Sequence, residues 1–455
     1  MSDSYRYAQG QTHEAIAFLI PAELQRLIRD ACVVLFFLIH LQVFVSVPIK
    51  LNGGPLPRLG FVWAIGSILG LGLALTKQLR TAAIALGIFP FMALCLWAYV
   101  SSTWTANPVD TLRASTFMTC SFLGACAIAG HLTWEEILAR LTLSIGSLMI
   151  VSVILAVAVP SIGQMTDILQ GAWSGVWGEK QAMGMYAALL ILASLALVLS
   201  NRKYWPCLFL VPLSLLAIIG TTGKTAILMS LMGIAVLSVG WLVQKDLRIA
   251  IATLWTSIVV GCVAIYGLTQ GKELVFRLLG RTPDFTGRTE VWREVEYVAS
   301  KRPTTGYGFH AVWEDQTSVA GPYQWIADGT GFYPQNAHSS WLDATLQLGT
   351  PGLMLLTACM VLAWLAALIG LRKGGPGALF ALSALATLTM ISFTESILLS
   401  SMDMPWLLVM LIAAKSMQEL LFPTSIPMPG PYPNRGYVHG RWDIAPFPPK
   451  RPFPR

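Results

Sequence analysis

Apolar segments long enough to cross a lipid bilayer alternate with short polar segments along almost the whole chain. A helix of about 20 apolar residues spans the hydrocarbon core, and a helix also satisfies its own backbone hydrogen bonds there. The pattern therefore predicts an all-α, polytopic membrane protein with about twelve transmembrane helices. The expected crossings are residues 31–47, 59–75, 82–100, 112–130, 141–160, 182–199, 205–243 (two crossings, broken near 220–225), 249–268, 341–371, 377–394 and 405–421.

One long hydrophilic segment divides these crossings into two groups. We expect residues 31–268 to form helices one to nine, residues 269–340 a large external loop, and residues 341–421 helices ten to twelve. The 341–371 segment is too long for one span, so part of it is expected to be a surface helix. Residues 1–30 form a charged N-terminal segment, and residues 422–455 form a Pro- and Arg-rich tail that we expect to be disordered.

Composition agrees with a membrane protein and excludes two other classes. Hydrophobic residues make up 55% of the chain and charged residues 12%, which argues against a soluble multidomain protein. The net charge of +7 comes from loops and the tail, without the basic and aromatic patch that binds nucleic acid. All seven cysteines lie within apolar segments without metal-ligand spacing, so we expect neither disulfides nor zinc.

Basic residues of the short loops define the orientation, because cytoplasmic loops of membrane proteins are enriched in Lys and Arg. The richer side carries Lys77, Arg80, Arg140, Arg202, Lys203, Lys245, Arg248, Arg372 and Lys373. The poorer side carries Lys50, Arg58, Arg113, Lys180 and Lys224. We therefore predict that both termini are cytoplasmic. The long loop would then lie outside the cytoplasmic (inner) membrane, in the periplasm if the cell is Gram-negative.

His338 is the first candidate for chemistry, because it closes the external loop just before an apolar helix. Ser340 and Asp343 have the spacing of a capping box, so Asp343 is expected to cap this helix. The positive end of a helix dipole favours a neutral imidazole, which can accept a proton near pH 7. His338 is therefore a candidate general base. Taken alone, it could equally be a histidine that only hydrogen-bonds the loop backbone.

Cations on the same external side are candidates for binding an anion. Gly287 would let an anion approach the backbone beside Arg288. Lys224 lies at the external end of two apolar helices, where a lone cation is costly without a partner. Its surroundings resemble a nucleotide-binding loop, but position 218 is Ile218 where that motif needs glycine. The sequence allows two roles for Lys180: it could pair with Glu179, or it could line the path of the acceptor.

One reaction uses a base and several cations at this location. ATP and nucleotide sugars are absent outside the cytoplasmic membrane, so an activated sugar would arrive there on a lipid diphosphate. Its departure needs cations to stabilise the leaving charge, and the attacking hydroxyl needs a base. Tryptophans could stack on sugar rings, although each could equally belong to the aromatic belt at the membrane interface. They are Trp173, Trp177, Trp292, Trp313, Trp325 and Trp341.

These motifs together resemble the O-antigen ligase and Wzy-type polymerase superfamily, and within it most nearly the exopolysaccharide polymerases of the ExoQ type. The ligase signature is His-[Asn/Ser/Gln], nine residues, then Gly-x-x-[Gly/Thr/Tyr]. It occurs as His338-Ser339 followed by Gly349-Thr350-Pro351-Gly352. Other blocks that resemble family motifs are Gly175 to Gln181, Thr286-Gly287-Arg288-Thr289 with Trp292, and Arg302-Pro303 with Gly306-Tyr307-Gly308-Phe309.

The resemblance implies a GT-C-like glycosyltransferase with His338 as the base and Arg288 on the diphosphate. Lys224 stands where members usually carry arginine, which would lose bidentate binding. Further substrate-binding residues implied by the resemblance or by charge are Lys180, Arg281, Arg302, Trp292 and Tyr307. An inverting, metal-independent reaction without a cofactor is expected. Glu395 and Asp403 are expected to be structural hydrogen-bond partners, and His310 is a second-tier candidate.

The sequence thus predicts a polymerase that transfers a growing glycan from undecaprenyl diphosphate to another lipid-linked repeat unit. The lipid bilayer and a chain-length regulator (a polysaccharide co-polymerase) are candidate partners. A ligase that moves finished glycan to lipid A core or to a protein is the nearest alternative. A transporter or flippase of about twelve helices is a second one, and it would predict ionisable residues at mid-membrane and a two-halves repeat.

Overall fold

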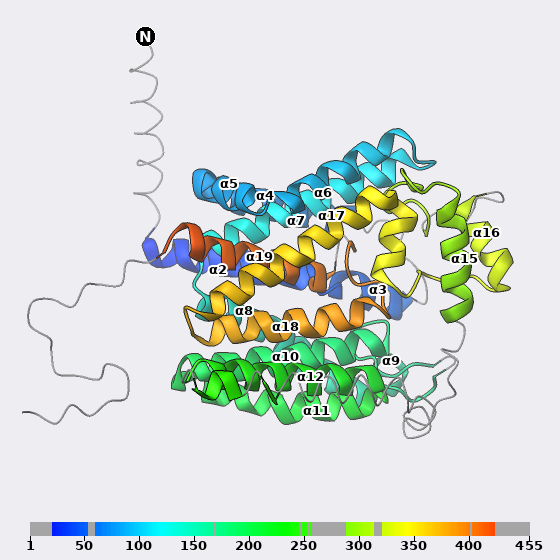
Figure 1. Cartoon of the computed structure of the whole chain (residues 1–455). Coiled ribbons are helices and arrows are strands. Elements are labelled where there is room, and N and C mark those ends of the chain that lie inside the picture. The colour runs from blue at the N-terminus through cyan, green and yellow to red at the C-terminus, as the bar shows by residue number, and fades with distance from the viewer. Residues whose placement is uncertain are drawn as a thin grey trace, which may run out of the picture.

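The computed structural model describes residues 21–52, 60–166, 169–245, 248–252, 255–256, 288–313, 321–400 and 403–423. These residues form a bundle of roughly aligned helices with two further helices, α15 and α16, at one end (Figure 1). Beyond one isolated bridge between Gln164 and Trp173, they contain no β-structure. The predicted all-α, polytopic fold class is confirmed.

The apolar segments become helices because a long apolar run can bury its side chains while satisfying its backbone internally. The N-terminal group comprises α2 (Ala22–His40), α3 (Val43–Asn52), α4 (Gly60–Thr76), α5 (Gln78–Gly87), α6 (Phe89–Val100), α7 (Pro108–His131), α8 (Trp134–Ala158), α9 (Pro160–Gly163), α10 (Lys180–Ser200), α11 (Leu210–Thr221) and α12 (Lys224–Val243). The C-terminal group comprises α15 (Arg288–Ser300), α16 (Pro322–Thr330), α17 (Ser340–Leu371), α18 (Pro376–Ser392) and α19 (Met404–Leu421).

Within the described residues, seven helices are long and apolar enough to cross a membrane. The α4–α5 pair, bent by 105°, raises this number to eight if it is one span. The crossing expected at 82–100 is not one straight helix, because α5 ends at Gly87 and α6 starts again at Phe89. Pro90 explains the new start, since proline has no N–H to continue the preceding helix. The crossing expected at 249–268 lies almost entirely outside the described residues.

The α17 segment is broken rather than continuous. Gly349 has φ 66° and ψ −169°, which is not helical. A Cβ at this position would lie 2.6 Å from the carbonyl carbon of Thr304, so the close approach also requires glycine. Residues 340–348 are separated from the spanning part by this break. The expectation of a surface helix is wrong here, because Ser340, Asp343 and Leu348 are buried.

The external loop has a small hydrophobic core of its own. Val291, Val295 and Val298 of α15 pack with Ile326 of α16 and with Leu346 of α17. This core joins α15 and α16 to the first part of α17 (Figure 1). The loop is therefore built onto the helix that starts directly after His338.

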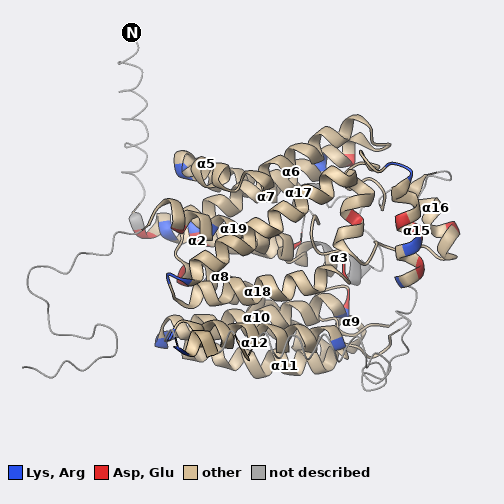
Figure 2. Ribbon diagram, in the orientation of Figure 1, with Lys and Arg blue, Asp and Glu red and all other residues tan. Residues whose placement is uncertain are grey.

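Charged side chains collect at the two ends of the bundle, and most of its length is free of them (Figure 2). Arg140 pairs with Asp30 at 2.5 Å and Lys203 with Glu135 at 2.8 Å. Figure 2 shows further Lys and Arg residues at the end of the bundle opposite α15 and α16, in agreement with the predicted basic side.

Candidate active site

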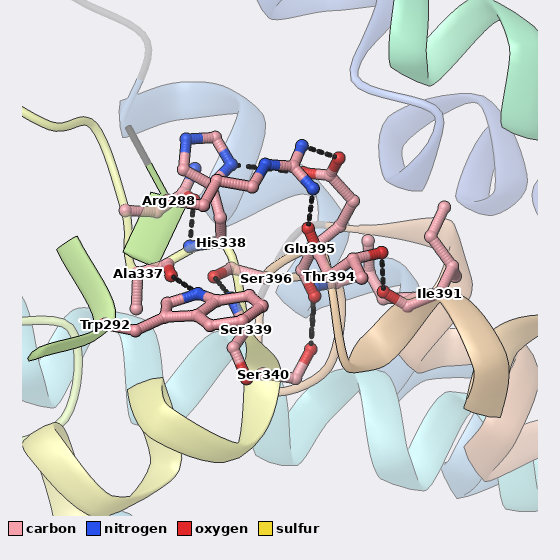
Figure 3. A network of polar contacts seen from close by, with 12 residues as sticks. Arg288, Trp292, Ala337, His338, Ser339, Ser340, Ile391, Thr394, Glu395 and Ser396 are labelled. Carbon is pink, nitrogen blue, oxygen red and sulfur yellow. Dashed lines mark hydrogen bonds and ion pairs between the residues drawn. The ribbon is translucent and has the colours of Figure 1, made fainter. Parts of the chain in front are cut away.

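One carboxylate joins the two residues that the sequence singles out most strongly (Figure 3). Glu395 Oε1 lies 2.5 Å from Nη2 of Arg288, and Glu395 Oε2 lies 3.2 Å from Nδ1 of His338. Arg288 Nη1 also donates to the Thr394 carbonyl oxygen at 2.7 Å. Arg288 begins α15, His338 precedes α17, and Glu395 follows α18, so three separate parts of the chain meet here.

The backbone around His338 holds the imidazole in place. His338 has φ 48°, a left-handed conformation that is uncommon for a residue with a side chain. Its N–H donates to Asn336 Oδ1 at 2.8 Å, which stabilises this turn. Trp292 of α15 donates from Nε1 to the Ala337 carbonyl oxygen at 3.0 Å. Trp292 therefore positions the histidine segment in this state, whether or not it also contacts a sugar.

The segment that carries Glu395 is held by Ser340. The Ser340 hydroxyl donates to the Glu395 carbonyl oxygen at 2.9 Å and accepts from the N–H groups of Ile397 and Leu398 at 3.0 Å each. The expected capping box is wrong, because α17 has Ser339 at its N-cap without a side-chain cap. Asp343 instead accepts a hydrogen bond from Trp313 Nε1 at 2.8 Å. Ser340 and Asp343 thus form hydrogen bonds with residues distant in sequence instead of capping the helix.

The contact with Glu395 also sets the tautomer of His338. An ionised Glu395 favours the proton on Nδ1, which leaves Nε2 as the acceptor. Among the described residues, Nε2 of His338 has no hydrogen-bond partner. About one third of the His338 side chain (33%) is exposed, although His338 itself lines neither of the cavities described next.

A cationic pocket adjoins this group. Lys180 at the start of α10, Lys224 at the start of α12 and Arg288 line a cavity of about 70 Å³ together with Glu395. The N-terminal ends of two helices open into it, and both contribute a partial positive charge. The structure thus brings together three of the predicted cations. This arrangement suits an anionic group such as a diphosphate.

A larger polar cavity also borders Glu395. Its two adjoining hollows, of about 320 and 230 Å³, share Asn336, Ser396 and Asp403 in their walls. Glu179 and Glu395 line the first hollow. Asp343 and Gln347 line the second, together with His310, the second-tier candidate from sequence. The two hollows together form the polar cavity.

Glu179 and Asp403 of this cavity hold their protons more tightly than usual. Removal from bulk water raises the pKa of Glu179, the nearby Glu395 raises it further, and His338 lowers it. Burial raises the pKa of Asp403 from 3.8 to about 6, against the lowering effect of its hydrogen bond with Ser400. Carboxylates therefore face one another in this part of the site.

Not every predicted substrate-binding residue reaches the site. Arg302 lies over the ring of Tyr307 at 5.0 Å, and the Tyr307 hydroxyl donates to the Val298 carbonyl oxygen at 3.0 Å. Neither residue lines the cationic pocket or the polar cavity. Their segment instead supports the break in α17, since Thr350 donates to the Pro303 carbonyl oxygen at 2.7 Å. Arg281 lies outside the described residues, so its predicted role stays a prediction.

The tryptophans that could stack on sugars are mostly engaged with protein. Trp177 is buried and donates to the Leu41 carbonyl oxygen at 3.0 Å, and Trp341 donates to Ser392 at 3.1 Å. Trp313 is half-buried and lines the polar cavity. It is the one of the six that lines the second hollow.

Glu395 is the residue whose central position sequence reasoning missed. It was expected only as a structural partner. A signal was present, because a carboxylate just beyond the C-terminal end of an apolar helix is disfavoured by the helix dipole. An ionisable residue in such a place usually has a functional partner. The described residues contain no group of three His, Cys, Asp or Glu placed to hold a metal ion.

Comparison with known proteins points to the same superfamily as the sequence motifs. Residues 209–357 match the family model described as O-antigen ligase. The exopolysaccharide production protein ExoQ of Rhizobium meliloti (strain 1021) is 24% identical over 309 residues, covering 63% of this chain and 66% of ExoQ. The resemblance to the O-antigen ligase and Wzy-type superfamily is confirmed. The chain therefore matches just under two thirds of this ExoQ relative. The family match spans Lys224, Arg288 and His338.

Proposed function

We propose that the protein is a glycan polymerase of the external face of the bacterial inner membrane. It transfers a growing glycan from undecaprenyl diphosphate to a sugar hydroxyl of another lipid-linked repeat unit. The observation that carries this proposal is the single carboxylate that bridges Arg288 and His338 beside a pocket of cations. The similarity to ExoQ, an exopolysaccharide production protein, supports the same reaction class.

The cationic pocket would hold the leaving group. Arg288, Lys180 and Lys224 surround the place where the diphosphate of the donor would sit. Their charges stabilise the diphosphate as it departs, which is where negative charge develops in the reaction. A diphosphate is a good leaving group, so no acid is needed to protonate it. The proposed reaction requires no metal ion or cofactor for this step.

His338 would activate the acceptor. Its Nε2 takes the proton of the attacking hydroxyl, while Nδ1 stays hydrogen-bonded to Glu395. The negative charge of Glu395 stabilises the imidazolium that results. A bond forms between the acceptor oxygen and the anomeric carbon, and the bond from that carbon to the diphosphate breaks. Attack from the face opposite the diphosphate inverts the anomeric configuration.

A glycan ligase is the second candidate function, because the matching family model is described as O-antigen ligase. A ligase would use the same donor and the same histidine, and it would differ only in the acceptor. Deletion of the gene distinguishes the two reactions. Accumulated single repeat units on the lipid carrier support the polymerase, whereas finished polymer left on its carrier supports the ligase. A chain-length regulator is the partner that a polymerase would need.

The proposal is tested with His338→Ala, Arg288→Ala and the shape-conserving Glu395→Gln in cells lacking the native gene. We expect each variant to reduce polymer by roughly 100-fold or more, since each removes the base, a diphosphate contact or the group that orients both. Polymer is measured by gel analysis, and the amount of inserted protein by immunoblot of membranes.

Arg293→Ala and His131→Ala are the matched controls. Arg293 lies on the same helix as Arg288 but is 70% exposed, and His131 lies at the end of α7 bonded to Thr76. Both controls are expected to make normal polymer. Normal polymer from well-inserted His338→Ala and Arg288→Ala variants contradicts the proposed function.

A further inference from the structure

The two cavities that meet at Glu395 have opposite electrostatic character. Lys180, Lys224 and Arg288 line the cationic pocket. The walls of the polar cavity contain no Lys or Arg among the described residues, and their charged side chains are all carboxylates. They are Glu179, Asp343, Glu395 and Asp403. A diphosphate is therefore attracted to one side of the site and repelled from the other.

Gln347 presents an unused hydrogen-bond donor to the polar cavity. Only 8% of this residue is exposed. Its Oε1 accepts from the His310 N–H at 2.7 Å, but no acceptor within the described part of the chain pairs with its Nε2. Because Gln347 lines the second hollow, this amide group faces it. An acceptor atom of a group bound in the hollow would pair with this amide.

The remaining walls suit a sugar ring. Trp313 offers an aromatic face next to Asp343, which fixes the indole through the 2.8 Å hydrogen bond. Asp403 accepts from Nε2 of Gln42, so this carboxylate is also held in place. Carboxylates, amides and aromatic rings are groups that bind hydroxyls and ring C–H groups. The volumes of the two hollows are within the usual range for small-molecule sites or just below it, about 300–1,000 Å³.

We propose that the polar cavity binds the acceptor sugar of the lipid-linked repeat unit and selects a neutral, hydroxyl-rich sugar over an acidic one. Hydroxyls of a neutral sugar donate to Asp403 and Asp343 and accept from Gln347. A sugar carboxylate would enter a cavity with four carboxylates and no cation, which costs like-charge repulsion and desolvation. This inference rests on the proposed function, because it assigns the acceptor half of that site.

The experiment uses the full-length protein in lipid vesicles with its native lipid-linked repeat unit as donor and acceptor. A second acceptor is the same unit with the primary alcohols of its sugars oxidised to carboxylates. The variants are Gln347→Glu, which keeps the bond to His310 and removes the donor, and Asp403→Asn, which removes the charge. Transfer to acceptor and hydrolysis of the donor by water are measured separately.

We expect both variants to raise the KM for the native acceptor about tenfold, the effect of one lost hydrogen bond, with donor hydrolysis unchanged. Wild-type protein should transfer glycan to the oxidised acceptor about tenfold less efficiently, or worse, than to the native acceptor. Asp403→Asn should reduce this difference between the two acceptors. Gln324→Glu and Asp328→Asn are the matched controls, because this bonded pair lies on α16 away from the cavity. Both controls should behave as wild type.

Two results overturn the inference. One is an acceptor KM within twofold of wild type in both cavity variants, and the other is equal use of the native and oxidised acceptors by wild type. A wild-type protein that neither transfers nor hydrolyses the native donor instead contradicts the proposed function. The two failures are thus distinguishable.

Discussion

Glu395 contacts both catalytic candidates because its two carboxylate oxygens point to different partners. Oε1 meets the guanidinium of Arg288 and Oε2 meets the imidazole of His338. Each contact orients its partner, and the pair of contacts holds the guanidinium and the imidazole near each other. A residue can bridge in this way only where three segments of the chain meet. In the sequence, the position of Glu395 next to an apolar helix is only a weak indication of that role.

The raised pKa of Asp403 makes the stability of the folded protein depend on pH. It accepts a hydrogen bond from Gln42, and Glu179 raises its pKa further, while Tyr186, His310 and the other carboxylates line the same cavity. Its pKa is about 6 in the folded protein and 3.8 when unperturbed. Between these values the folded state binds more protons than the unfolded state. This contribution to stability is therefore full below about pH 4 and is lost as the pH rises through 6.

Asp403→Asn removes this dependence. At pH 7 we expect the variant to melt roughly 2–5 °C above wild type, because the buried charge is gone. At pH 4 the two proteins should melt alike. Thermal unfolding of detergent-solubilised protein at several pH values measures the difference, with Asp328→Asn on the exposed side of α16 as the control. If the variant melts below wild type at pH 7, the charge of Asp403 does not destabilise the folded protein and this prediction is wrong.

At the scale of elements, the break in α17 decides where the site lies. Residues 340–348 turn toward α15, and the spanning part of α17 continues from Gly349. The turn around Gly306 supports the break, since Tyr307 donates to the Leu346 carbonyl oxygen at 3.0 Å. Gly349 of the ligase-like signature thus has a backbone role, because the break at this residue separates the segment that follows His338 from the spanning helix.

Gly349→Ala should disrupt this arrangement. A methyl group there meets the Thr304 backbone at 2.6 Å, and φ 66° is strained for alanine. We expect a loss of about 3 kcal/mol of stability together with reduced polymer. Gly374→Ala is the control, because Gly374 has φ 76° but nothing within 4 Å of an added Cβ. Its cost should be about 1 kcal/mol. Equal melting temperatures for the two variants would show that close approach to Thr304 has no effect.

At the scale of the whole molecule, charged residues lie at both ends of one bundle, and the candidate site lies at only one of them. Figure 2 shows charged residues at both ends, with the loop helices α15 and α16 at only one of them. The proposed reaction needs the loop end to face outward, because lipid-linked glycans are assembled into polymer beyond the cytoplasm. The basic residues of the opposite end favour that orientation.

Cysteine accessibility tests the orientation. In a variant without native cysteines, Asp328→Cys on α16 should react with a membrane-impermeant maleimide in intact cells with a permeabilised outer membrane. Lys373→Cys, after α17 at the other end, should react only after the inner membrane is opened. Both positions are exposed, so reactivity reports their side of the membrane. The reverse pattern would place His338 in the cytosol and exclude the proposed donor.

The sequence by itself determined the all-α membrane fold, and it predicted the separation of basic loops from the long loop and the roles of His338 and Arg288. Hydrophobic length, loop charge and short motifs are local properties, so they can be read along the chain. Only the tertiary structure decided the bridging role of Glu395, the role of Ser340 in place of a capping box, and the opposite charges of the two cavities. These depend on contacts between segments far apart in the chain, by 107 residues for Arg288 and Glu395 and by 361 for Gln42 and Asp403, which no local pattern encodes.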